Sequence, residues 1–105
     1  MYTQNEKFSR IKAQHPNWSD EQIWTAISLD METDNVIEER GANVDRNDPI
    51  ILREILGRAQ EWLKEVLPAI FEKVKTLFVQ IFQKISEWAV VNWNRILEFV
   101  GKYFA

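Results

Sequence analysis

The segment AIFEKVKTLFVQIFQKISEWAVVNWNRILEFVGKYF, residues 69–104, decides the fold class. Twenty-one of its 36 residues are apolar. Placed at 100° per residue, most of them fall on one arc, and most charged residues lie opposite. This is the pattern of an amphipathic helix. We expect one face of the segment to be buried and take these residues as a candidate interaction face: Phe71, Val74, Phe78, Ile81, Phe82, Ile85, Trp88, Trp93, Ile96, Val100 and Tyr103.

The length of this segment leaves two alternatives open. A continuous helix of 36 residues would be about 54 Å long at 1.5 Å per residue, which is longer than a domain of this size is wide. Either the helix breaks into a hairpin near Ala89–Asn94, or it projects and needs a partner. Asn92 lies inside the apolar arc, where it either fixes the register of packing or marks the break.

Helix-capping patterns divide the first part of the chain. A capping box that begins at Thr3 opens a first helix, and Pro16 ends it, because proline disfavours a helical residue before it. A second capping box begins at Ser19. Trp18 precedes this cap and Ile23 follows four residues later, which is the pair of a hydrophobic staple. We therefore expect a second helix from residue 20.

A third short helix is expected before the first glycine. Thr33 or Asp34 can cap it, and Gly41 supplies the left-handed position that commonly ends a helix. Residues 1–41 are thus predicted to form an acidic unit of three short helices, and residues 42–48 a polar loop.

The remaining residues, 49–105, are predicted to form an apolar, amphipathic helical region. Asp48-Pro49 is a strong helix start, and Gly57 in that helix indicates a close contact with another helix. Pro68 removes a backbone donor, so it separates two helices or bends one. The fold class is all-α, a small bundle of about five helices, and we expect both regions to pack as one domain.

Composition and charge exclude several classes of function. The chain has 105 residues, no cysteine and one histidine, which excludes disulfides and thiolate metal sites. Residues 1–48 carry five basic and ten acidic side chains, and the whole chain has a net charge of −3. We therefore expect no nucleic-acid partner and no cofactor. No charge-free apolar run approaches about 18 residues, so we expect a cytoplasmic protein, with membrane association as an alternative.

The acidic loop has a partial calcium-binding pattern. Asp45, Asn47 and Asp48 alternate like the first ligands of an EF-hand loop. The motif then requires glycine at its sixth position and glutamate at its twelfth, and these are Ile50 and Leu56. The residues are better interpreted as helix caps, and we expect no metal site.

The chain offers few groups for catalysis. Glu38-Glu39 and Asp20-Glu21 are adjacent in predicted helices, where neighbouring side chains diverge by about 100°, so they do not converge on a substrate. His15 has no nucleophile pattern beside it. We expect no catalytic residues and no enzyme.

One pattern resembles a known family: Phe8-x-x-Ile11-x-x-x-His15-Pro16, then Ile23, Ala26 and Ile27, then a third short helix. It is similar to the three-helix ubiquitin-binding modules of the CUE and UBA type. The resemblance implies a small helical adaptor, in which a phenylalanine-proline pair at the first loop and a dileucine on the third helix contact ubiquitin. This chain has His15 in place of the phenylalanine and Glu39-Arg40 in place of the dileucine.

The apolar excess of the C-terminal helices predicts an interaction protein. A second apolar line at Val79, Val90 and Leu97 has no use on a simple surface helix. We expect the chain to assemble through residues 50–104 into a homo-oligomer or onto a larger complex. The alternative is a peripheral membrane protein that inserts the same face into lipid, because tryptophan and lysine together suit a membrane interface.

Overall fold

The computed structural model describes residues 3–88 and 90–103. The described residues form five helices and no strand, which confirms the predicted all-α bundle. The helices are α1 (Gln4–Gln14), α2 (Asp20–Arg40), α3 (Pro49–Val66), α4 (Pro68–Glu87) and α5 (Trp93–Tyr103). No helix among the described residues is long and apolar enough to cross a membrane.

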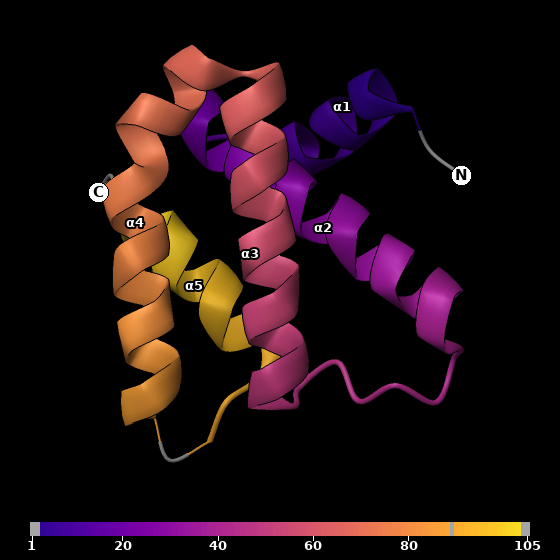
Figure 1. Cartoon of the computed structure of the whole chain (residues 1–105). Coiled ribbons are helices and arrows are strands. Elements are labelled where there is room, and N and C mark those ends of the chain that lie inside the picture. Colours follow the sequence, from indigo (N-terminus) through magenta and orange to yellow (C-terminus); the bar gives the residue numbers. More distant parts are fainter. Residues whose placement is uncertain (1–2, 89, 104–105) are drawn as a thin grey trace.

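Helix α2 is at the centre of the bundle and contacts each of the other four helices. In Figure 1, α3 and α4 lie side by side, α2 crosses behind α3, and α5 lies behind the α3–α4 pair. Helix α1 packs mainly on α2, and Leu97 of α5 adds to the small apolar cluster between them. The molecule measures 31 × 30 × 26 Å.

The predicted helix starts are confirmed by their hydrogen bonds. The Ser19 hydroxyl accepts from the Gln22 backbone N–H, and the Gln22 side chain accepts from the Ser19 N–H at 2.7 Å, which completes the capping box. The Asp48 carboxylate accepts from the Ile50 N–H at 2.8 Å and caps α3. Pro68 begins α4 at the corner where α3 ends, so these are two helices.

The prediction of a separate third helix is wrong, because α2 is continuous over Asp20–Arg40. No glycine or proline interrupts these residues. Thr33 does not cap a helix; its buried hydroxyl donates to the Leu29 carbonyl at 2.7 Å instead. Thr25 and Ser28 make similar bonds to the carbonyls of Glu21 and Thr25. Because these hydroxyls are satisfied within the helix, α2 can be buried on several sides.

The alternative of one continuous C-terminal helix is also wrong. Helix α4 ends at Glu87 and α5 begins at Trp93, so the predicted break is observed; Ala89 lies outside the described residues. A 36-residue helix of about 54 Å could not fit along the 31 Å axis of this molecule. Asn92 marks the break, since its side chain accepts from the Arg95 N–H at 2.8 Å and caps α5.

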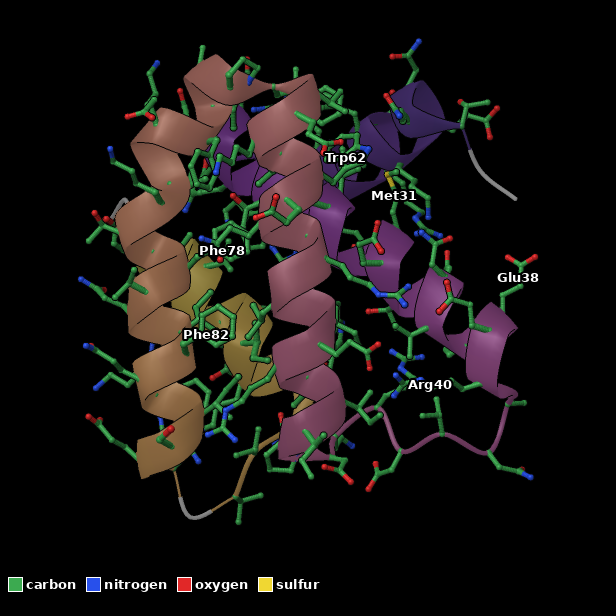
Figure 2. The ribbon with its side chains drawn as sticks, in the orientation of Figure 1. Met31, Glu38, Arg40, Trp62, Phe78 and Phe82 are labelled. Atoms are coloured by element: carbon green, nitrogen blue, oxygen red, sulfur yellow. The ribbon has the colours of Figure 1, made fainter. Side chains whose placement is uncertain are left out.

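The main core cluster contains buried residues of α2, α3, α4 and α5. Figure 2 shows Phe78 and Phe82 pointing from α4 into the bundle. Phe78 is fully buried, and Phe82 is partly buried against the same cluster. A smaller cluster joins α1 to α2 around Ile23 and Ile27. Gly57 does not mark a close contact, because no neighbouring atom lies within 4 Å of the position its Cβ would take.

Candidate functional site

The predicted interaction face lies inside the chain's own core. Six of its eleven residues are buried, and five are partly buried against the same cluster. The buried residues are Val74, Phe78, Ile81, Ile85, Ile96 and Val100, and the partly buried ones are Phe71, Phe82, Trp88, Trp93 and Tyr103. In this conformation the face is used to pack α4 and α5 onto the bundle, and most of it is not open to a partner.

The residues of the second apolar line differ in their exposure to solvent. Val79 and Val90 are exposed, whereas Leu97 is partly covered at the seam between α5 and the α1–α2 corner. Two adjoining hollows lie along this seam and share His15, Trp18 and Leu97. We call them together the corner groove. Its residues are Arg10, Ile11, Gln14, His15, Trp18, Ala26, Asp30, Trp93, Asn94, Leu97, Glu98 and Gly101.

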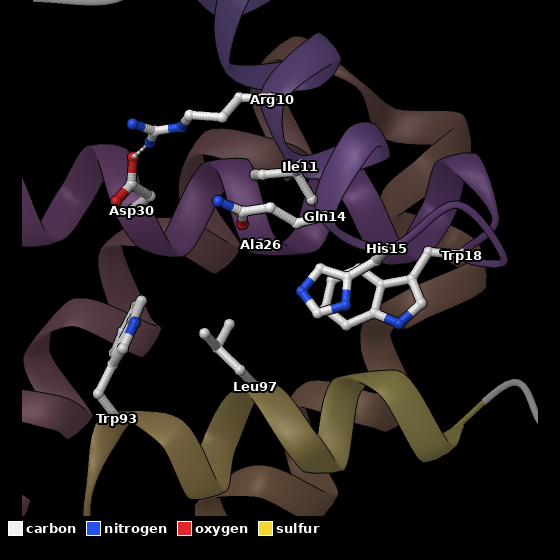
Figure 3. Close-up of a pocket in the computed structure, with 9 residues that line it drawn as sticks. All are labelled: Arg10, Ile11, Gln14, His15, Trp18, Ala26, Asp30, Trp93 and Leu97. Carbon is white, nitrogen blue, oxygen red and sulfur yellow. Dashed lines mark ion pairs between the residues drawn. The ribbon is translucent and has the colours of Figure 1, made fainter.

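The deeper part of the corner groove is a pocket of about 170 Å³. Figure 3 shows Trp93 and Leu97 rising from α5 toward Ala26 and Gln14 on the opposite wall. A dry apolar cavity of about 150 Å³ is large enough to hold a benzene ring. The pocket therefore has room for one aromatic or large aliphatic side chain.

Stacked rings close one end of this pocket. The His15 imidazole and the Trp18 indole lie parallel, with centroids 3.8 Å apart and planes 9° apart (Figure 3). The Lys12 ammonium donates to the Trp18 carbonyl at 3.1 Å. A Cβ added at Gly101 would lie 3.2 Å from the Trp18 indole nitrogen, so glycine at this position lets the indole approach α5.

The wall formed by α5 is fixed by one buried polar side chain. Gln22 is 4% exposed, and its amide nitrogen donates to the carbonyls of Val100 at 3.2 Å and Gly101 at 3.0 Å. These carbonyls lie in the last turn of α5, where no residue of the helix can satisfy them. The Gln22 side chain thus completes the cap of α2 and ties that cap to the end of α5.

The wall formed by α1 is held by ion pairs with α2. Lys7 is buried along its stem, and its ammonium donates to Asp30 and lies 3.5 Å from Asp34. Arg10 lies 3.9 Å from Asp30 and reaches the end of the pocket opposite His15. Both walls of the corner groove are therefore positioned by side chains within the chain.

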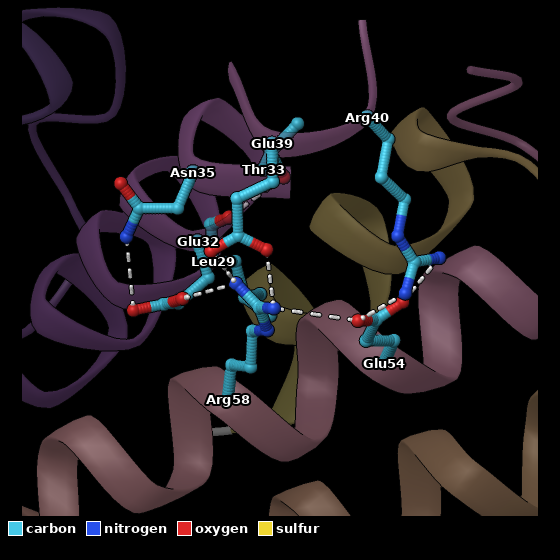
Figure 4. Close-up of polar contacts among 8 residues, drawn as sticks. All are labelled: Leu29, Glu32, Thr33, Asn35, Glu39, Arg40, Glu54 and Arg58. Carbon is cyan, nitrogen blue, oxygen red and sulfur yellow. Dashed lines mark hydrogen bonds and ion pairs between the residues drawn. The ribbon is translucent and has the colours of Figure 1, made fainter. Parts of the chain in front are cut away.

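A separate polar cluster joins α2 to α3 away from the groove. Figure 4 shows the Arg58 guanidinium between Glu39 and Glu54, with Arg40 also paired to Glu54. The two terminal guanidinium nitrogens of Arg58 donate to the two Glu39 carboxylate oxygens, at 3.0 and 2.6 Å. This hydrogen bonding lowers the pKa of Glu39 and raises that of Arg58. Arg58 and Glu32 also line a shallow hollow beside Trp62, but the charges of this cluster are paired with one another within the protein.

The loop residues with a partial calcium pattern are used in hydrogen bonds to backbone N–H groups. Asp45 accepts from the Asn47 N–H at 2.9 Å, and Asn47 accepts from the Trp93 N–H at 3.0 Å, which adds a second cap to α5. No group of three or more histidine, aspartate or glutamate side chains in the described part of the chain is placed to hold a metal ion. The capping interpretation is confirmed for Asp48 and Asn47, whereas Asp45 bonds within the loop and caps no helix.

The residues behind the resemblance to the CUE and UBA modules are separated in the structure. His15 lies in the corner groove, and Glu39 and Arg40 pair with α3 at the far end of α2. The predicted interaction face included Trp93 but not the groove wall formed by α1 and α2, because the residues of that wall share no motif. The only available signal was the i, i+4 spacing of Trp93, Leu97 and Gly101 on one helix.

Comparison with protein-family models, with curated proteins and with solved structures finds no match for this chain.

Proposed function

We propose that the protein is a non-enzymatic interaction module whose corner groove receives one large apolar side chain from a segment of a partner protein. The observation that carries this proposal is the pocket of about 170 Å³ beside Trp93 and Leu97. Aromatic side chains that enter a pocket at an interface commonly contribute a large share of the binding free energy. Trp93 and Leu97 are four residues apart on α5, so both side chains face this pocket.

The sequence predicted that residues 50–104 contact a partner, and we now place this contact in the corner groove. Most of the apolar face of α4 and α5 is occupied by the core, so a partner that used it would have to displace α3 and α2. Insertion of the same face into lipid would require the same opening. The groove needs no such change, since its walls are in place in the folded chain.

The test uses indole as a probe of the pocket. In the 15N-labelled protein, millimolar indole should shift the side-chain resonances of Trp93 and Trp18 saturably. Ala26 lies in the pocket wall and is 4% exposed, so Ala26→Leu should fill the pocket and abolish these shifts. Ala69→Leu is the matched control. Ala69 is exposed at the start of α4, so this substitution adds the same side-chain volume away from the pocket.

The proposal would be contradicted if indole caused no shifts in the wild type. It would also be contradicted if the shifts persisted in Ala26→Leu while the helicity of this variant was unchanged.

Self-association stays a prediction. Sedimentation velocity at micromolar concentration measures it directly. A heavier species that Ala26→Leu returns to 12.5 kDa would identify a second copy as the occupant. A single 12.5 kDa species would contradict self-association.

A further inference from the structure

A second hollow lies between α4 and α5, next to the corner groove, with which it shares Glu98. It has a volume of about 320 Å³ and a mainly polar lining. We call it the basic hollow; its residues are Lys84, Trp88, Arg95, Glu98, Phe99 and Lys102. Three cations and one carboxylate give it a local charge of +2 in a chain whose net charge is −3.

Arg95 is held in a fixed position in this hollow. One guanidinium nitrogen donates to the Val90 carbonyl at 2.9 Å, and the guanidinium carbon lies 5.0 Å from the centre of the Trp88 ring. Trp88 is in turn braced edge-on by Phe99, with centroids 6.4 Å apart. A guanidinium has five N–H donors, so this arrangement leaves oriented donors for an anion.

The other two cations have few competing partners. Lys84 lies 3.5 Å from Glu87 at the surface, an exposed pair of the kind that contributes little. Lys102 is exposed and makes no ion pair with another described residue. Along α5, Arg95 and Lys102 are seven residues apart, or about 10 Å, and their long side chains can converge between these positions.

We propose that the basic hollow binds a dianionic phosphate group, supplied either by a phosphate monoester or by free phosphate. A phosphate monoester carries about −1.5 to −2 charges at pH 7, which matches the net +2 of the lining. A single carboxylate would leave one cation uncompensated. The planar guanidinium of Arg95 suits the bidentate recognition of phosphate oxygens, and the lysines supply point charges around it.

The experiment titrates the 15N-labelled full chain with inorganic phosphate at constant ionic strength and follows the Arg95 Nε and Trp88 Nε1 resonances. Saturable shifts should appear at pH 7.5 and weaken at pH 5.5, where phosphate loses its second charge. Lys102→Gln should weaken binding about fivefold and Arg95→Gln about tenfold. Lys75→Gln, which removes one charge from an exposed pair elsewhere on α4, should leave binding unchanged.

Two further arms complete the test. Acetate should bind more weakly than phosphate, and O-phosphoserine distinguishes the source. Tighter binding of O-phosphoserine than of phosphate would identify a phosphorylated side chain, and the reverse would identify free phosphate. Three results would overturn the proposal: no saturable shift with phosphate, equal binding of acetate, or unchanged binding by Lys102→Gln. Because Lys102 is exposed, its substitution leaves the fold intact even if Arg95→Gln disturbs Trp88.

Discussion

Gln22 and Gly101, 79 positions apart in the sequence, are joined by a hydrogen bond of 3.0 Å from the Gln22 side-chain amide to the Gly101 carbonyl. The same side chain accepts from the Ser19 N–H. Gln22 therefore caps both the first turn of α2 and the last turn of α5. Its two roles can be separated, because the oxygen of the amide serves α2 and the nitrogen serves α5.

Gln22→Glu should destabilise the protein by about 1–3 kcal/mol. Glutamate keeps the oxygen that accepts from Ser19, but it cannot donate to Val100 and Gly101, and it places a negative charge beside their carbonyls. Ser19→Ala, which removes only the cap of α2, should cost about 1 kcal/mol. Urea unfolding measures both, with exposed Gln83→Glu as the control. A Gln22→Glu variant as stable as the wild type would show that the contact with α5 contributes nothing.

Two glycines should respond differently to alanine. Gly57→Ala should stabilise the protein by about 0.5–1 kcal/mol, because glycine is unfavourable inside a helix and the new methyl group meets no neighbour within 4 Å. Gly101→Ala should gain less than Gly57→Ala or lose stability, because its Cβ would press on the Trp18 indole. Thermal unfolding compares them. An equal gain at both positions would mean that Trp18 does not pack closely on α5.

The Arg58–Glu39 pair should make stability depend on acid pH. Hydrogen bonds from Arg58 lower the pKa of Glu39 below its ordinary value of 4.5. A lowered carboxyl pKa adds stability above the unfolded-state value, and this is lost as the pH falls through the folded-state value. The melting temperature of Glu39→Gln should therefore fall less steeply between pH 5 and 2.5 than that of the wild type. Glu38→Gln is the neighbouring control and should follow the wild type; identical slopes for all three proteins would contradict the assignment.

Local signals in the sequence predicted most of the helix boundaries. The starts at Ser19 and Asp48 were found because a capping residue and its partner lie within four positions of each other. The separate third helix was predicted wrongly because Thr33 can either cap a helix or bond the preceding turn. Burial against other helices decides between these two uses, and the local sequence does not report it.

The candidate site was harder to predict than the fold. The amphipathic pattern of α4 and α5 identified a face that must be buried, but it cannot say whether the same chain or a partner covers that face. The groove depends on contacts between distant residues, such as Gln22 with Gly101 and Lys7 with Asp30. Neither pair has a fixed spacing in the sequence, so the opposing walls became visible only when the fold was known.

The central claim is that the apolar face of α4 and α5 is buried in the core of the single chain. The helicity and mass of Phe78→Asp, measured in buffer without lipid, test this claim most directly. Phe78 is fully buried in the core of the single chain. Loss of a buried phenylalanine costs about 3–5 kcal/mol, and an unpaired buried carboxylate adds to this. We expect circular dichroism to show loss of helix, with exposed Val79→Asp as the folded control. A Phe78→Asp protein with the helicity and light-scattering mass of the wild type would contradict the claim, because this face would then be free for a partner or lipid.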